Sequence, residues 1–220
     1  QVPIWNGSSF TIYSTNQIAL TLNAGAHIAN TIYDVCVFLN NSVPTLATGP
    51  AWSNSADGAG NRGTGAATTE LQRVNGLWVN AVAITGVNGS STFSIPANQC
   101  TYLGSILIDG VAGQISATIS YGQNRKWGVW NAYNRQQIAL QVGDSTIGWQ
   151  YNTATIRPSD NASANSLTLF SGLAEETFRT TFQQGVQNSG AGGTVAGTIR
   201  WARKLRTGPT SALIGRCRPV

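Results

Sequence analysis

Two Asn-Gly dipeptides, Asn75-Gly76 and Asn88-Gly89, each stand between short runs of β-branched, aromatic and aliphatic residues. A two-residue type I′ turn requires positive φ at both central residues, which Asn and Gly tolerate better than other residues. Each dipeptide therefore predicts a tight hairpin, the first over 71–79 and the second over 83–95. A third hairpin is expected where 102–108 turns through 109–113 into 114–121, with a core face made of Ile115, Ala117, Ile119 and Tyr121.

The run 31–40 alternates with period two, and both of its faces are largely apolar. A strand that is apolar on both faces is typical of the centre of a sheet. Asp34 interrupts one of these faces. Because a buried carboxylate without partners is costly, we expect Asp34 to find hydrogen-bond donors or to lie at the exposed start of the strand.

Further strands are expected at 127–133, 137–142, 147–155, 166–170 and 195–201. The run 175–186 fits a helix or a strand, because Phe178, Phe182 and Val186 recur every four residues among several threonines. We predict a strand there, since a lone helix would break an otherwise consistent pattern.

Composition supports the same fold class. Charged residues make up 10% of the chain, against about 25% in an ordinary globular protein, so the surface is mostly neutral and polar. Such a surface suits strands and turns better than helices, which usually carry Glu, Lys and Arg. We therefore predict an all-β fold of the β-sandwich or jelly-roll kind, formed by one domain over residues 1–220.

Two segments add nothing obvious to a core. Residues 49–65 form a run rich in Gly, Ser and Asn, which predicts a long loop that carries Trp52. The Trp52 ring is either tucked back into the body, which is the favoured alternative, or offered to a partner. Residues 200–220 form a basic segment, and the longer stretch from Phe178 to Val220 contains seven cations and no acidic residue, so this stretch carries +7 and the rest of the chain −2. The alternatives for the basic end are a docking segment and a solvated tail. We expect contacts between chains through Trp52, Arg200, Arg203, Lys204 and Arg206.

The three cysteines, Cys36, Cys100 and Cys217, form no C-x-x-C pair, and their odd number argues against a disulfide framework. Cys36 is expected to be a buried thiol. No stretch reaches the roughly 18 apolar residues of a membrane span, which predicts a soluble protein without membrane insertion. The sequence has no methionine and begins Gln1-Val2-Pro3, so we expect that an N-terminal piece was removed or is not represented.

Catalytic residues are hard to assemble from this sequence. His27 is the sole histidine and is expected to be a surface or half-buried residue in a turn, without the sequence context of a hydrolase triad. One histidine and three scattered cysteines suit no zinc site, and the loop aspartates stand singly, so no metal or cofactor is expected. Glu175 and Glu176 would point to opposite faces of a strand and cannot form a glycosidase pair. We expect no enzymatic activity.

Aromatic and amide side chains are the remaining chemistry. Residues 125–135 combine rings, amides and arginines, and such groups can stack on sugars or bases and donate hydrogen bonds. Partner or glycan contacts are expected here from Trp127, Trp130, Asn131, Tyr133, Asn134 and Arg135, together with Trp52 of the loop. The alternative is that these strand aromatics belong to the core.

Several strings of the sequence are distinctive: Ile32-Tyr33-Asp34-Val35, Thr48-Gly49-Pro50-Ala51-Trp52, the segments 63–65 and 69–80, and Trp130-Asn131-Ala132-Tyr133-Asn134-Arg135. Together they resemble a group of tailed-bacteriophage and prophage virion proteins, over roughly residues 17–185. The resemblance implies a structural protein of a virion, either a fibre or spike domain for host attachment or a head-decoration protein. It implies no catalytic or binding residue.

The expected partners are therefore other virion subunits and a host surface glycan, and the chain is expected to form a homo-oligomer, a trimer by analogy with phage fibres. Nucleic acid is not an expected partner. One alternative function is a secreted glycan-binding module, which the sequons at Asn6, Asn40, Asn88 and Asn161 would fit. The other is a glycan-degrading tailspike enzyme, which the lack of a catalytic set disfavours.

Overall fold

The computed structural model describes residues 2–53, 62–119, 125–138, 162–165, 167–168, 170–173, 197–203 and 213–219. Within these ranges the regular secondary structure is β-strand, apart from one 3-10 turn, η2 (Ser163–Asn165). The predicted all-β fold class is thus confirmed, while the sandwich or jelly-roll arrangement stays a prediction. In the described part of the chain, no helix has the length and apolarity that crossing a membrane requires.

The largest sheet has eight strands in the order β5-β6-β9-β3-β4-β7-β8, with β12 paired to β9. Their bounds are β3 (Ile32–Asn40), β4 (Val43–Ala51), β5 (Leu71–Val74), β6 (Leu77–Asn80), β7 (Ile84–Asn88), β8 (Ser91–Ile95), β9 (Thr101–Leu107) and β12 (Val129–Asn131). All pairings in this sheet are antiparallel.

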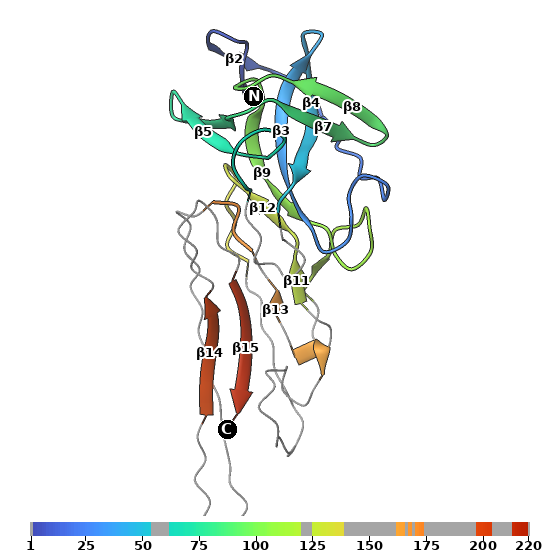
Figure 1. Ribbon diagram of the computed structural model, residues 1–220, viewed down its shortest axis with the longest axis vertical. Coiled ribbons are helices and arrows are strands. Elements are labelled where there is room, and N and C mark those ends of the chain that lie inside the picture. Colours follow the sequence, from blue (N-terminus) through green and yellow to red (C-terminus); the bar gives the residue numbers. More distant parts are fainter. Residues whose placement is uncertain are drawn as a thin grey trace, which may run out of the picture.

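Two smaller sheets complete the described structure. A ribbon pairs β1 (Val2–Trp5) with β2 (Phe10–Tyr13). A five-stranded sheet, β10-β11-β13-β15-β14, contains β10 (Ala117–Thr118), β11 (Arg125–Trp127), β13 (Leu167–Thr168), β14 (Gly197–Arg203) and β15 (Leu213–Pro219). The eight-stranded sheet and the β1–β2 ribbon lie at one end of the molecule's long axis, and β14 and β15 lie toward the other (Figure 1). We call the first end the head.

Strand β3 occupies the centre of the head, between β4 and β9, as the apolar character of both its faces predicts. Ile32, Tyr33, Cys36, Val37 and Phe38 are all buried. Asp34 is also buried and has hydrogen-bond donors around it, so the expectation that this carboxylate finds partners is confirmed.

Both neighbours of β3 shift register beside Asp34. The β3–β4 pairing shifts between Tyr33 and Val35, and the β3–β9 pairing shifts between Val35 and Cys36. Bulges of this kind redirect side chains and locally bend a strand. They mark the place where the most polar part of the core is built.

The turn of the first hairpin is as predicted. Asn75 and Gly76 join β5 to β6 with φ of 48° and 88°, the two positive values that a type I′ turn needs. The second hairpin, β7–β8, also forms, but its turn is displaced by one residue. Asn88 pairs with Ser91, so Gly89 and Ser90 are the central residues. The Asn88 side chain instead bonds Ala19 O and Leu46 O, which explains why it stays in the strand.

The turn of the third hairpin was predicted correctly, but its core face was not. Asp109 N donates to Gln114 O at 3.0 Å, and Ile108 pairs with Ile115. Beyond this bridge the chain leaves β9, because β10 pairs with β11 instead. Ile119, which was expected in the core, is 57% exposed.

The predicted strand 127–133 is divided at Gly128 into β11 and β12. Gly128 N donates to Ser116 O, and Gly128 O accepts from Leu107 N, both at 2.9 Å. A Cβ on Gly128 would lie 2.9 Å from two backbone oxygens of these neighbours, Leu107 O and Ser116 O. Close approach of two backbones at a glycine is a usual cause of such a break in a strand.

Cys36 and Cys100 form a disulfide, with their Cα atoms 5.6 Å apart. The expectation of a free buried thiol at Cys36 was therefore wrong. Cys36 lies on β3 and Cys100 just precedes β9, and these strands are neighbours. Spacing in the sequence carries no sign of this pairing, because it arises from the register of strands that are 64 residues apart.

The predicted loop 49–65 begins later than expected, its residues 62–65 lie outside strands as predicted, and its residues 54–61 lie outside the described residues. Strand β4 continues to Ala51, and Trp52 and Arg62 are both buried. Pro50 fits a strand here because it lies beside the irregular pairing with β3, where the ladder does not need its missing N–H.

The basic end contains the antiparallel pair β14–β15 rather than a tail without structure. Strand β14 agrees with the prediction over 195–201, and β13 lies within the predicted 166–170. Gln137 and Ile138 lie outside strands. The rest of 137–142 and the predictions for 147–155 and 175–186 lie outside the described residues.

Candidate functional site

The polar centre of the head is an ion pair between Asp34 and Arg62. Arg62 Nε lies 2.6 Å from Asp34 Oδ2, and Arg62 Nη2 lies 2.9 Å from Asp34 Oδ1. Both side chains are almost completely buried. Arg62 Nη2 also donates to the carbonyl oxygen of Gly172 at 2.5 Å. The pair therefore connects the central strand with two segments that are distant in the sequence.

Two hydroxyl groups complete the shell around this carboxylate. Ser105 Oγ donates to Asp34 Oδ1 at 2.7 Å, and Thr69 Oγ1 donates to Asp34 Oδ2. Each carboxylate oxygen thus accepts two hydrogen bonds, which uses its full capacity. A carboxylate with no lone pair left for substrate, buried in the core, serves structure rather than proton transfer.

Tyr102 also belongs to the site around Asp34. Its hydroxyl lies 2.7 Å from Ser105 Oγ. Burial and, secondarily, the negative charge of Asp34 raise the pKa of Tyr102 far above its ordinary value. Burial by itself would lower the pKa of Arg62, but Asp34 and, secondarily, Tyr102 together more than offset this, and the net shift is upward. The phenol therefore remains protonated and the guanidinium remains charged at any physiological pH.

A row of stacked groups runs from this ion pair to the surface, and we call it the aromatic column. The Arg62 guanidinium lies 4.5 Å from the ring centroid of Trp52 and 5.1 Å from that of Tyr102. The rings of Tyr102 and Trp130 stack at 6.2 Å and 26°. At the outer end, the guanidinium of Arg135 lies 5.7 Å from the Trp130 ring. Trp130 thus packs on its buried side against Tyr102, which belongs to the fully hydrogen-bonded site around Asp34.

Gly172 makes the close packing of the column possible. A Cβ at this position would overlap both the Trp130 ring and the Tyr102 hydroxyl. Its carbonyl oxygen is also the one that accepts from Arg62. The segment around Gly172 therefore fixes the column by packing and by hydrogen bonding together.

A second stacked pair lies on the neighbouring hairpin. Arg73 on β5 is paired with Trp78 on β6, and its guanidinium lies 4.7 Å from the Trp78 ring centroid. Strands β6 and β12 use the same edge of β9: Val79 pairs with Thr101, and Asn131 pairs with Gly104. Since β12 runs toward β6 along this edge, Tyr133, two residues after the strand, approaches the hairpin.

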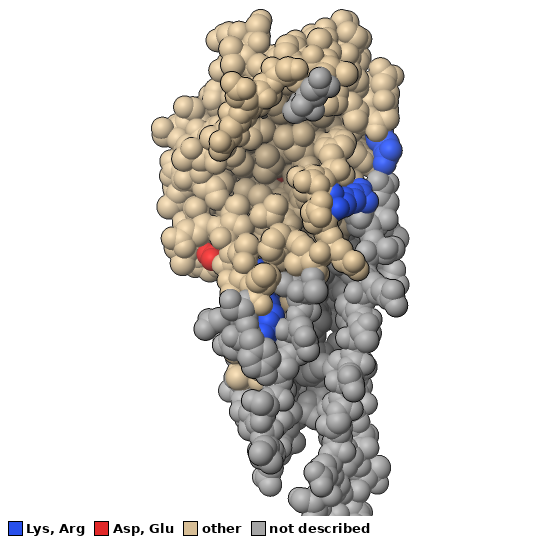
Figure 2. All heavy atoms as spheres, turned by 180° about the vertical axis from the view of Figure 1, so that it is seen from behind, with Lys and Arg blue, Asp and Glu red and all other residues tan. Residues whose placement is uncertain are grey.

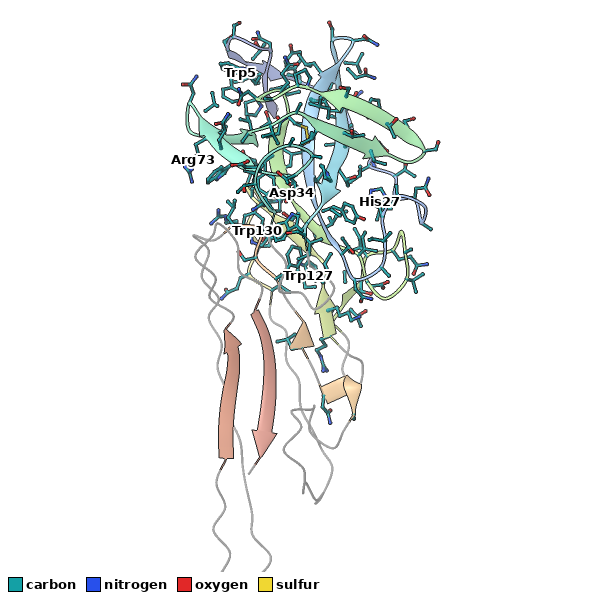
Figure 3. All side chains as sticks on the ribbon, in the orientation of Figure 1. Trp5, His27, Asp34, Arg73, Trp127 and Trp130 are labelled. Atoms are coloured by element: carbon teal, nitrogen blue, oxygen red, sulfur yellow. A yellow bond between two sulfur atoms is a disulfide. The ribbon has the colours of Figure 1, made fainter. Side chains whose placement is uncertain are left out.

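The electrostatics agree with this placement. Partial burial raises the pKa of Tyr133, and the positive charge of Arg73 acts in the opposite direction. Tyr133 is nevertheless 53% exposed, and Arg73 and Arg135 are exposed. Arg73 and Trp130 lie on the side of the head away from His27 (Figure 3). We define the aromatic-cation surface as Arg73, Trp78, Trp130, Tyr133 and Arg135.

The residues of 125–135 that were expected to contact a partner or glycan lie in different environments. Trp130, Tyr133 and Arg135 belong to the aromatic-cation surface. Trp127 is half-buried in β11. Asn131 and Asn134 are exposed, but Asn131 Oδ1 accepts the N–H groups of residues 133 and 134 at 2.9 and 2.8 Å. The Asn131 side chain therefore builds the turn that presents Tyr133.

The expected contacts between chains are partly corrected. Trp52 is 2% exposed and packs with Ile32, Leu107 and Phe170, so its ring is not offered to a partner. Trp52 N donates to Ile32 O at 2.9 Å, which extends the β3–β4 contact and draws the ring inward. Arg200 and Arg203 belong to β14, while Lys204 and Arg206 lie outside the described residues.

His27 is fully buried, so the expectation of a surface or half-buried residue was wrong. Asn23 N donates to Nδ1 at 3.0 Å, and Nε2 lies 2.9 Å from Thr48 Oγ1, which in turn donates to Val87 O at 3.2 Å. The neutral tautomer protonated at Nε2 satisfies this chain of bonds. Burial lowers the pKa of His27, and a contact with the Asn23 backbone opposes this more weakly.

Sequence reasoning missed Arg73 and Trp78, although a signal for them was present. A two-residue turn at Asn75-Gly76 puts 74 opposite 77 and 73 opposite 78. The side chains of opposed residues in an antiparallel pair lie together. The prediction of the turn therefore already contained the Arg73–Trp78 pair.

No cluster of three His, Cys, Asp or Glu residues suited to a metal occurs within the described ranges. Comparison with known proteins adds no identification: no protein-family model, no curated protein and no solved structure matches this chain.

Proposed function

We propose that this chain is a surface structural protein of a bacteriophage virion, a fibre or spike domain for host attachment or a head-decoration protein. The observation that carries the proposal is a disulfide-linked head that presents arginine and aromatic side chains on a nearly uncharged surface. Figure 2 shows this surface: on the face drawn, Lys and Arg atoms lie at one flank and at the lower edge of the described surface, an acidic group lies near the opposite side, and the rest is uncharged.

The core of the head supports a role outside the reducing cytosol. The Cys36–Cys100 disulfide crosslinks the central strand to its neighbour. Disulfides persist in oxidising environments, which include secreted proteins and virion surfaces. The buried Asp34–Arg62 ion pair, with its further hydrogen bonds, is a second stabilising interaction inside the head. A protein that must endure outside a cell benefits from both.

The environments of the buried Asp34 and His27 support a structural or binding role rather than catalysis. The Asp34 carboxylate has all its acceptor positions filled by protein donors. His27 is buried with both ring nitrogens engaged. Neither group is available to a substrate as an acid or a base, since a catalytic group must reach the reacting atom. A glycan-degrading tailspike is therefore the weaker alternative.

A secreted glycan-binding module of a cell is the second candidate. The disulfide and the aromatic-cation surface would serve that function equally well. The two candidates differ in where the protein is found and with what it assembles. We propose assembly with other virion subunits and a homo-oligomeric state, a trimer by analogy with phage fibres.

Mass spectrometry of gradient-purified particles, from the cells whose DNA encodes this chain, tests the proposal. The expected result is that the chain co-purifies with capsid or tail proteins at a stoichiometry of several copies per particle. Recovery of the chain only in the free secreted fraction, with none in the particles, would contradict a virion role and favour the secreted module.

A further inference from the structure

We propose that Asn75-Gly76, at the tip of the β5–β6 hairpin, is a site of spontaneous deamidation, where the side-chain amide becomes a carboxylate. The chain offers an internal comparison, because the dipeptide Asn-Gly occurs three times, at 6–7, 75–76 and 88–89. The three sites share the same two residues, so a large difference between them in the folded protein must come from structure. This inference does not depend on the virion role.

Deamidation of an Asn-Gly sequence needs water as its only co-reactant. The backbone nitrogen of the glycine loses its proton and attacks Cγ of the asparagine. The bond between Cγ and Nδ2 then breaks, and ammonia leaves with that proton. Water opens the resulting five-membered succinimide at either carbonyl, which gives aspartate or isoaspartate. Glycine favours the attack because it has no Cβ to hinder the approach. The reaction therefore requires a free asparagine amide, a free glycine N–H and room for the ring.

The structure meets these three conditions at Asn75-Gly76. Both residues are exposed, and within the described ranges neither the Asn75 amide nor Gly76 N makes a hydrogen bond. The pair Val74–Leu77 closes the turn, so the two central residues lie outside the ladder. A Cβ on Gly76 would meet nothing within 4 Å. The turn also projects from the side of the head (Figure 1), so the ring has room to close.

The reacting groups of Asn88-Gly89 are engaged instead. Oδ1 of Asn88 accepts from Thr21 N at 2.9 Å. Its Nδ2 donates to Ala19 O and Leu46 O, both at 3.0 Å. The attacking nitrogen is engaged too, because Gly89 N donates to Thr21 O at 2.8 Å. The bonds of Nδ2 and of Gly89 N must break before ammonia can leave and the ring can close. The reaction here is therefore confined to a locally opened state.

Asn6-Gly7 combines features of both sites. Oδ1 of Asn6 accepts from Ser8 N and Ser9 N, each at 2.9 Å. Its Nδ2 donates to Thr11 Oγ1 at 3.3 Å. The site is exposed, however, and Gly7 N donates no hydrogen bond within the part of the chain that the structure describes. Because the amide is engaged and the attacking nitrogen is not, we expect an intermediate rate.

Deamidation at this turn would alter the aromatic-cation surface. It places a negative charge on the hairpin two residues after Arg73. Isoaspartate also adds a methylene group to the main chain, within the turn whose geometry pairs Arg73 with Trp78. A lengthened two-residue turn no longer fits type I′ geometry, which sets the register of the hairpin. The Arg73–Trp78 stack should therefore loosen as the protein ages.

Peptide mapping of the aged full chain tests the inference. The folded chain, with its disulfide intact, is incubated at mildly alkaline pH and digested at acidic pH, and mass spectrometry follows the conversion of each asparagine. We expect deamidation at Asn75 to be about tenfold or more faster than at Asn88, since each hydrogen bond that must break lowers the population of the reactive state. Asn6 should react at an intermediate rate. Protein isoaspartate methyltransferase should label mainly the peptide that contains residue 75.

Two controls separate structure from intrinsic reactivity. In urea, after reduction of the disulfide, the three sites should react at similar rates. Gly76→Ala supplies the Cβ that hinders the attack and should slow deamidation at residue 75 in the folded chain and in urea. Gly110→Ala changes no Asn-Gly dipeptide and should leave the rate at Asn75 unchanged. Far-UV circular dichroism checks that each variant remains folded.

Equal rates at Asn75 and Asn88 in the folded chain would overturn the inference, and so would a difference between these sites that is just as large in urea. Failure of the proposed function would look different, because these rates are measured on the purified chain. Preferential deamidation at Asn75, in a chain absent from purified particles, would uphold the inference and reject the virion role.

Discussion

At the scale of single residues, the most consequential feature is a buried charge pair that the sequence shows only in part. Asp34 could be expected to find donors, because it interrupts an apolar strand. Its partner Arg62 could not be identified, because it lies in a Gly- and Asn-rich run with no periodicity. The pair forms where two bulges meet, and bulges leave no pattern in a sequence of this kind.

Removing one member of this pair should be costly. Arg62→Met leaves the Asp34 carboxylate buried without its cation, which should lower the free energy of unfolding by about 3–5 kcal/mol. Chemical denaturation measures this change. The double variant Asp34→Asn with Arg62→Met should lose less than the two single variants added together, since it leaves no unpaired charge. Strict additivity would show that the two side chains do not act as a pair.

Burial of neutral His27 makes stability depend on pH. The pKa of His27 is lowered in the folded protein, so as pH falls through about 6.5 the unfolded chain takes up a proton before the folded chain does. Stability should therefore be constant above this pH and decline below it. Denaturation at pH 7.5 and pH 5.5, both above the range of ordinary carboxylates, measures the slope. His27→Gln should remove most of it, and an unchanged slope in this variant would contradict the assignment.

At the scale of elements, the hairpin at Asn75-Gly76 is the part that local sequence determines best. Its turn has the two positive φ values, and a Cβ on Gly76 would meet nothing within 4 Å. Gly76→Val should thus destabilise the protein through backbone strain alone, by about 1 kcal/mol or more. Gly110→Val is the control, because Gly110 also has open space but no positive φ. Equal melting temperatures for the two variants would mean that the turn differs from type I′.

The disulfide between β3 and the start of β9 is the second test at this scale. Cys36→Ala with Cys100→Ala should lower stability by about 2–5 kcal/mol, because the bond closes a long loop in the unfolded chain. A reducing agent should destabilise the unchanged protein by a similar amount and leave the double variant unaffected. Alkylation of three free thiols under non-reducing conditions would contradict the disulfide.

These elements also show where prediction from the sequence ends. The strand periods and the first turn are local, so β3, β5, β6 and β9 could be anticipated. The displaced turn at Asn88 could not, because its side chain is held by backbone groups 42 and 69 residues away. The aromatic-cation surface could be predicted from the sequence only in part. Arg73 and Trp78 follow from the turn, whereas their approach to Tyr133 depends on β6 and β12 sharing one edge of β9.

At the scale of the whole molecule, the basic end is separated from the head along the long axis (Figure 1). The β14–β15 register places Arg200 opposite Arg216. We propose that this basic end, with seven cations and no acidic residue from Phe178 onward, meets an acidic surface of another subunit.

Charge reversal at this end should impair assembly. Arg203→Glu together with Lys204→Glu should leave the isolated chain folded and reduce its incorporation into particles, with a larger defect at low salt, where charges are least screened. Quantitative immunoblotting of purified particles measures incorporation. Arg73→Glu, a reversal on the head, is the control and should be incorporated normally. Normal incorporation of the double variant at every salt concentration would mean that the basic end makes no such contact.

We propose that the head faces outward on a virion. Immunogold electron microscopy of intact, unfixed particles, with antibodies raised against residues 2–118, tests it most directly. We expect gold at regular positions on the outer surface of capsid or tail, and loss of this labelling in particles from a strain that lacks the gene. Unlabelled particles, with the chain detected only after disruption or only in the surrounding medium, would contradict it.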